Sequence, residues 1–94
     1  MNLSDTQRSW LKTNGIKAER HYEGFRFFRP SAHGYALGSV VIARPKVGGG
    51  LLVEMRAASE WDRATACYVG RSKNVATLRA ALGELCAEPV ARVA

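Results

Sequence analysis

Arginine and aromatic side chains recur at every second position, or multiples of it, along several predicted strands of this chain. These residue types are the ones best suited to bind a partner. They are Tyr22, Arg26, Phe28, Arg56 and Tyr68. Because successive side chains of a strand point to opposite faces of a sheet, we expect all five on one face, beside Leu52 and Glu54. Guanidinium groups form forked hydrogen bonds with phosphate, and aromatic rings stack on unpaired bases. The same residue types anchor protein interfaces, so the pattern predicts a binding face for nucleic acid or for a protein.

Three further basic residues are candidate anion contacts outside this face. Lys46 lies in a glycine-rich loop, and Arg71 and Lys73 flank Ser72 at a predicted strand-to-helix junction. A helix N-terminus has unpaired N–H groups and the positive end of the helix dipole, which favour phosphate or carboxylate. We therefore expect Arg71 and Lys73 to take part in anion binding there.

The chain lacks the spacing of common catalytic and metal-binding motifs. It has no nucleophile elbow and no phosphate loop, since the glycines at 48–50 are not followed by Lys-Ser or Lys-Thr. His33 has the chemistry of a general base, but an isolated loop histidine is most often solvated. His21, His33, Cys67 and Cys86 are too scattered for a zinc site. The sequence predicts a non-catalytic binding protein without metal or cofactor.

The charge balance favours an anionic partner. Lys and Arg number 14 against 8 acidic residues, which gives a net charge of +6, and ten of the 14 are arginine. Arginine is the side chain best suited to forked contacts with phosphate or carboxylate. The alternative is that the charge serves solubility alone. The partners expected are nucleic acid or an acidic protein or nucleoprotein surface, and a homodimer is compatible with an open sheet face.

The length and hydropathy of the chain indicate how many domains it forms and in which cellular compartment we expect it. The 94 residues suffice for a single domain, 1–94, with its own core. No run of about 18 apolar residues occurs, and the N-terminus lacks the basic-then-apolar order of a signal peptide. We therefore expect a cytoplasmic protein without membrane contact, in which Cys67 and Cys86 stay reduced on apolar faces.

Periodicity predicts two helices and four strands. Ser4 and Gln7 have the spacing of a capping box, and Asn14-Gly15 is a typical left-handed stop, so the first helix is expected over 5–14. Alternation and β-branched residues predict strands over 20–29, 37–44, 51–57 and 65–70. The closing helix is expected over 73–87, with Ser72 as N-cap and an apolar stripe of Val75, Leu78, Leu82, Leu85 and Cys86. Residues 90–94 are expected to be a frayed tail.

This order of elements predicts an α+β fold in two layers: helix, four-stranded antiparallel meander, helix. The connections between strands are too short for crossovers, so consecutive strands pair as hairpins and both helices cover one face. The face with the arginine and aromatic side chains is then the uncovered one, and the alternative is that the tail, a loop or a symmetric copy of the chain covers it.

The segment 70–76, followed by Leu78–Leu85, resembles the final helix of double-stranded-RNA-binding domains. That family has a similar order of helix, strands and helix, and the resemblance implies contact with RNA at the start of the closing helix. The chain departs from the family's pattern at the basic cluster, where Asn74 and Thr77 stand in place of lysines and Lys73 remains.

A second class of function fits the same build. Short single-domain proteins with an open sheet face resemble, in general build, the inhibitor proteins of phages, including anti-CRISPR proteins, which block host nucleic-acid-directed complexes by binding. Salt separates the two hypotheses, because nucleic-acid affinity falls steeply with salt as counterions are released, whereas a hydrophobic protein interface responds little. Nucleic-acid binding is the first hypothesis, and a protein-binding inhibitor is the alternative.

Overall fold

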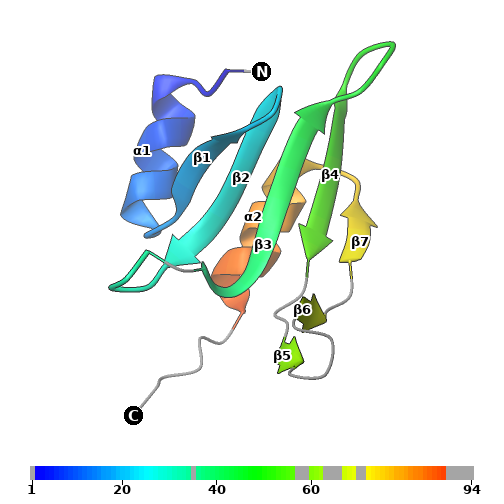
Figure 1. The fold of residues 1–94 in the computed structure, drawn as a ribbon. Helices are drawn as coiled ribbons and strands as arrows, with labels where there is room; N and C mark the ends of the chain where they lie inside the picture. The colour runs from blue at the N-terminus through cyan, green and yellow to red at the C-terminus, as the bar shows by residue number, and fades with distance from the viewer. Residues whose placement is uncertain (1, 35, 57–59, 63–66, 70–71, 89–94) are drawn as a thin grey trace.

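The computed structural model describes residues 2–34, 36–56, 60–62, 67–69 and 72–88, with the backbone alone described over 60–62 and 67–69. In these ranges a helix is followed by seven strands and a second helix (Figure 1). Their bounds are α1 Asp5–Thr13, β1 Lys17–His21, β2 Gly24–Pro30, β3 Ala36–Pro45, β4 Leu51–Arg56, β5 Glu60–Asp62, β6 Cys67–Val69, β7 Ser72–Val75 and α2 Leu78–Ala87. Neither of these helices is long and apolar enough to cross a membrane.

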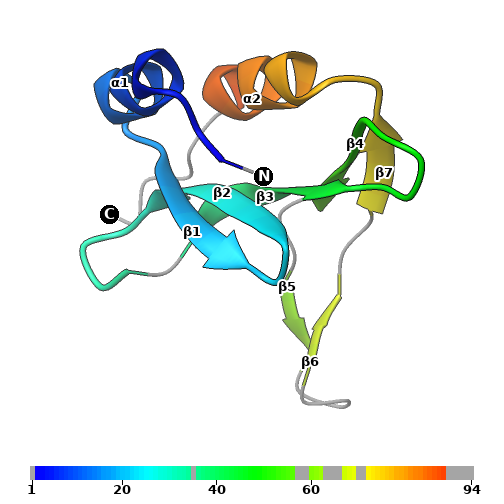
Figure 2. The same cartoon turned by 90° about the horizontal axis from the view of Figure 1, so that it is seen from above.

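The main sheet is antiparallel and has five strands in the order β1-β2-β3-β4-β7. β5 and β6 pair in a separate two-stranded sheet, inserted in the chain between β4 and β7. Both helices cover the same face of the main sheet, and the β5–β6 pair projects on the other side (Figure 2). The predicted α+β class and its helix–meander–helix order are confirmed, and the meander has five strands where four were expected.

Local signals set both ends of α1. Ser4 and Gln7 form the capping box, in which each side chain accepts a hydrogen bond from the other residue's backbone N–H. At the other end Gly15 has a φ of 68°, and the Ile16 N–H donates to the Leu11 carbonyl at 2.9 Å. A left-handed glycine with this hydrogen bond reverses the chain and brings Ile16 under the helix. The helix start and stop read from the sequence are therefore confirmed.

The predicted single strand over 20–29 is wrong, because the chain turns back within it. β1 and β2 form a hairpin whose turn is Tyr22-Glu23, with His21 paired to Gly24. Tyr and Glu are not typical turn residues, so the sequence pattern conceals the reversal. Gly24 was the available signal: a side chain there would collide with the Ala43 carbonyl of β3, and an isolated glycine in a strand often marks such a close approach.

The closing helix begins later than predicted, because Ser72–Val75 is the edge strand β7. It pairs with β4, with Val53 opposite Val75 and Arg56 opposite Ser72. The N-cap of α2 is Thr77, whose side chain accepts a hydrogen bond from the Ala80 N–H at 3.1 Å. Ser72 is therefore not a cap. The segment that resembles a double-stranded-RNA-binding helix lies partly in a strand.

Several boundaries of the other strands shift or lie beyond the described residues. The strands expected over 37–44 and 51–57 are observed as β3 and β4, and residue 57 is outside the described part. Of the strand expected over 65–70, the described residues form β6, which pairs with β5 and not with the main sheet. The expected tail, 90–94, is also outside the described residues.

The core lies between the sheet and the two helices. Five core residues are at most 1% exposed: Phe27, Val41, Ala43 and Val53 from the sheet and Leu85 from α2. The predicted apolar stripe of α2 is in place: Leu82 and Leu85 are buried, and Leu78 and Cys86 pack against the core. Val75 reaches the same core from β7 rather than from the helix.

A polar clamp fastens the end of α2 to the sheet. The backbone N–H and hydroxyl of Ser39 donate to the Glu88 carboxylate at 2.8 and 2.5 Å, and Arg29 donates to the Glu88 carbonyl at 2.8 Å. Ser39 is 3% exposed, so its N–H depends on this partner. Gly38 has a φ of 78° and lies against the Glu88 carboxylate, which leaves no room for a side chain. The clamp orients α2 over β3 and β4.

Candidate functional site

The uncovered face of the main sheet carries a row of residues across all five strands, charged or polar on four of them and apolar at Ile42 of β3. The pairing places Glu19, Arg26, Ile42, Glu54 and Asn74 directly opposite one another in turn. Their chain neighbours, such as Phe27, Ala43 and Val53, face the helices. Because side chains alternate along a strand, Arg44 and Arg56 belong to the same uncovered face. The structure thus places the predicted Arg26 and Arg56 on one face.

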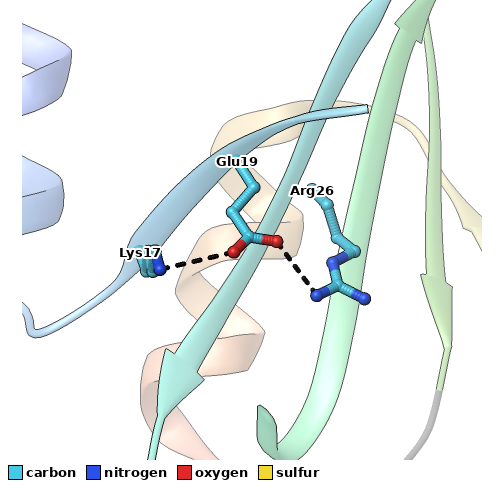
Figure 3. Close-up of polar contacts among 3 residues, drawn as sticks. All are labelled: Lys17, Glu19 and Arg26. Carbon is cyan, nitrogen blue, oxygen red and sulfur yellow. Dashed lines mark hydrogen bonds and ion pairs between the residues drawn. The ribbon is translucent and has the colours of Figure 1, made fainter. Parts of the chain in front are cut away.

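Arg26 is already engaged within the domain. Glu19 lies between Lys17 and Arg26, at 3.3 Å from the Lys17 Nζ and 3.0 Å from an Arg26 nitrogen (Figure 3). The hydrogen bond from Lys17 lowers the pKa of the Glu19 carboxyl most, and Arg26 lowers it further, against an opposing effect of desolvation. The Arg26 guanidinium also lies 4.8 Å from the centre of the Phe28 ring. Arg26 is therefore a poor candidate for a free phosphate contact.

Phe28 is not exposed, which corrects the prediction of a stacking residue at this position. It is 0% exposed, although it does not belong to the core cluster beneath the helices. The register between β2 and β3 shifts between Phe27 and Arg29, which disturbs the regular alternation at Phe28. Parity predicts the face of a side chain but not what covers it, so this burial is a tertiary effect.

Tyr22 is the exposed aromatic residue of the site. It occupies the β1–β2 turn, is 89% exposed and has a φ of 53°, an uncommon conformation for a residue with a large side chain. Its ring meets the edge of the His21 ring at a centroid distance of 4.8 Å and an angle of 81°. The turn thus holds a nearly free aromatic ring at one end of the sheet.

A hollow of about 470 Å³ lies beside Tyr22, and we call it the hairpin-end groove. Its lining residues come from the β1–β2 turn, from β3 and from β4: His21, Tyr22, Glu23, Ile42, Arg44, Pro45, Glu54 and Arg56. It brings together two of the predicted site residues, Tyr22 and Arg56, that are distant in the sequence.

The cations of the hairpin-end groove differ in how far they are neutralised. Arg56 pairs with Glu54 at 3.0 Å, with side chains 62% and 27% exposed. Arg44 is exposed and has no ion-pair partner among the side chains described in 2–34, 36–56 and 72–88. Lys46 follows closely in the β3–β4 loop and is exposed as well. Sequence reasoning missed Arg44, although it has the parity of Ile42 and so the same face.

The remaining predicted site residues do not join this groove. Lys73 lies on β7 opposite the core residue Met55, and its Nζ pairs with Glu84 of α2 at 3.0 Å, so it belongs to the helix-covered side. It does not lie at a helix N-terminus, which corrects that prediction. The backbone of Tyr68 lies in β6 opposite Trp61, and its side chain is outside the described part. Arg71 is outside the described residues.

The described residues contain no group of three or more His, Cys, Asp or Glu side chains arranged to hold a metal ion. His33 lies in an exposed loop, where its N–H donates to the Ser31 hydroxyl at 3.3 Å. Cys86 is a free, half-buried thiol packed against the core. Comparisons with protein-family models, with curated proteins and with solved structures found no match for this chain.

Proposed function

We propose that this protein binds single-stranded nucleic acid without catalysis, through the hairpin-end groove. Tyr22 provides the stacking surface for a base, and Arg44 and Lys46 contact the phosphate backbone. The observation that carries the proposal is the exposed Tyr22 ring, held in a strained turn beside an unpaired arginine in one groove.

The conformation of Tyr22 supports a functional role for its ring. A non-glycine residue in the left-handed region costs on the order of 1–3 kcal/mol. An 89% exposed ring buries too little apolar surface to offset that cost. Asn or Gly would suit the turn better, so the tyrosine is unfavourable for stability at this position. Binding that uses the ring gives a reason for its presence.

The arrangement of charges at the groove favours an extended nucleic-acid backbone as ligand over a single small carboxylate. Arg44 lines the groove, and Lys46 is exposed two residues further along the chain, so the two cations can follow an extended anionic chain. Glu54 neutralises Arg56, and its carboxylate suits the exocyclic amino group of a base rather than a phosphate. Proteins that bind single-stranded nucleic acid usually combine an aromatic ring, on which a base stacks, with cations that follow the phosphate backbone.

The test is a titration of fluorescently labelled single-stranded RNA and DNA of equal length, with a duplex for comparison, at several salt concentrations. Tyr22→Ala should weaken single-strand binding by about 5- to 150-fold, since loss of a stacked base costs about 1–3 kcal/mol. Arg44→Ala should reduce the slope of log affinity against log salt by about 1.

Arg8→Ala is the matched control, because it removes the same charge from an exposed position of α1 on the helix-covered side. Equal affinities for all three variants would contradict the proposal, as would tighter binding to the duplex. Affinity that does not respond to salt would instead favour a protein partner and the inhibitor hypothesis.

A further inference from the structure

A second groove lies on the opposite side of the sheet, between the two helices, and we call it the interhelix groove. It has a volume of about 410 Å³. Its lining residues come from the N-terminal segment, α1 and α2: Leu3, Thr6, Gln7, Trp10, Leu11, Leu78, Arg79 and Leu82. Figure 2 shows the two helices side by side in one layer, with the N-terminal segment descending between them.

The interhelix groove is apolar at its floor and aromatic at its rim. Leu3, Leu11 and Leu82 are 8%, 4% and 8% exposed and form part of the core. Trp10 is 42% exposed, although it belongs to the same groove. A tryptophan in this position has apolar surface that the domain itself leaves in water. Trp and Arg are also the residue types most enriched among the anchors of protein interfaces.

Among the described residues that line this groove, the charged one is a cation. This is Arg79, which is exposed and has no ion-pair partner within the described part of the chain. On α2, Glu84 is paired with Lys73 and Glu88 is held by Ser39. Glu84 and Glu88 are thus engaged, and Asp5 of α1 is exposed but does not line the groove. The charge at the groove itself is that of Arg79, which favours a ligand with negative charge.

From this combination we infer that the interhelix groove docks an amphipathic helix of another protein, with an apolar face and acidic flanks. A cleft between two parallel helices accepts the apolar side chains of a third helix at spacings of three and four residues. The leucine floor excludes a nucleic-acid backbone, which needs cations along its path. A second copy of this basic chain would place Arg79 near another set of cations, which like-charge repulsion disfavours.

The inference does not rest on the proposed nucleic-acid function, because the two grooves lie on opposite faces of the sheet. The failure of one leaves the other unaffected.

The experiment uses three labelled synthetic peptides that share the same leucines at helical spacing and differ in their flanking residues, which are Glu, Gln or Lys. Binding is measured by fluorescence anisotropy at about 0.15 M salt, which screens long-range attraction by the net charge of the protein. The Glu peptide should bind the whole protein about tenfold more tightly than the Lys peptide. Trp10→Ala should weaken the Glu peptide by about tenfold or more, as expected for an aromatic anchor.

Two charge variants separate docking from general attraction. Arg79→Glu should weaken binding of the Glu peptide by about tenfold and strengthen binding of the Lys peptide. Arg8 lies on α1 outside the groove, so Arg8→Glu should change the affinity for either peptide by less than about twofold. A third variant, Thr6→Glu, places an acidic group in the groove and should also weaken binding of the Glu peptide. It is a safe variant for folding, because an acidic residue in the first turn of a helix is favourable.

Three results would overturn the inference. The first is the absence of saturable binding by any of the peptides. The second is equal binding of the Glu and Lys peptides, or equal effects of Arg79→Glu and Arg8→Glu. The third is concentration-dependent self-association of the free protein that Trp10→Ala abolishes, which would assign the groove to a second copy of the chain.

Discussion

Phe28 and Tyr22 show how differently two aromatic residues of one hairpin can serve a small domain. Phe28 is completely buried and supports the Arg26 guanidinium at 4.8 Å from its ring centre, so its contribution is to stability. Tyr22 is 89% exposed and contributes little to packing. Two aromatic residues that the sequence pattern groups on one face therefore have separate roles.

Phe28→Ala should lower the free energy of unfolding by about 3–5 kcal/mol, as for other buried Phe-to-Ala changes. Tyr22→Ala is the matched control and should change stability by less than about 0.5 kcal/mol, because its ring is in water. Urea denaturation followed by circular dichroism measures both. A loss below about 1 kcal/mol for Phe28→Ala would mean that the ring is exposed and available for stacking.

The ion pairs of Glu19 give the stability of the fold a defined pH dependence. Because Lys17 and Arg26 lower the pKa of this carboxyl in the folded chain, its interactions stabilise the fold above its ordinary pKa of 4.5. That contribution is lost as the pH falls through the lowered value. A carbon-13 NMR titration of the Glu19 carboxyl should give a lower midpoint in the folded protein than in urea, and Lys17→Met should raise it. A folded midpoint equal to the unfolded one would contradict the geometry of Figure 3.

At the scale of elements, β7 changes the interpretation of the whole C-terminal region. Its pairing with β4 turns Ser72 and Lys73 into strand residues and moves the helix start to Thr77. The basic residues expected at a helix N-terminus are therefore separated from it. The anion contact that we propose lies instead at the hairpin-end groove, where Arg44 and the Tyr22 turn line the same hollow.

Thr77→Ala should destabilise the domain by about 1 kcal/mol, because the Ala80 N–H loses its capping acceptor. Ser72→Ala removes a hydroxyl of the same kind from the other candidate cap and should change stability by less than about 0.5 kcal/mol. Thermal unfolding of the two variants in parallel measures the difference. A larger effect of Ser72→Ala would return the helix start to residue 73.

At the scale of the whole molecule, a single carboxylate links the last helix to the middle of the sheet. Glu88 accepts hydrogen bonds from the backbone and the hydroxyl of Ser39, and its carbonyl accepts one from Arg29. These contacts hold the end of α2 on the face that both helices cover (Figure 2). The interhelix groove is lined by residues of α1, of α2 and of the N-terminal segment. The opposite face keeps the hairpin-end groove.

Glu88→Ala should lower the free energy of unfolding by about 1–3 kcal/mol, because the buried Ser39 donors lose their acceptor. Glu84→Ala removes the same kind of side chain from α2 itself, breaks an exposed ion pair with Lys73 and should cost less than about 1 kcal/mol. Chemical denaturation of both variants provides the comparison. Equal losses would show that the clamp adds nothing beyond a surface ion pair.

The sequence by itself determined the features that depend on neighbours along the chain. The capping box of Ser4 and Gln7 and the stop at Gly15 set α1, because each satisfies backbone groups within a few residues. Richness in β-branched residues indicated β3, and alternation of apolar residues indicated β4. The short connections indicated an antiparallel meander with both helices on one side. The α+β class follows from these local signals.

Tertiary structure decided the features that depend on distant partners. The turn at Tyr22-Glu23 lacks typical turn residues, and the meaning of its one local signal, Gly24, becomes clear only once β3 lies against it. The segment Ser72–Val75 is a strand because the edge of β4 is available to pair with it. Phe28 is buried although parity places it on the uncovered face, and the register shift between Phe27 and Arg29 is set by the pairing with β3. The candidate groove is lined by Tyr22 of the β1–β2 turn, Arg44 of β3 and Arg56 at the far end of β4, and the register of the sheet places them on one face.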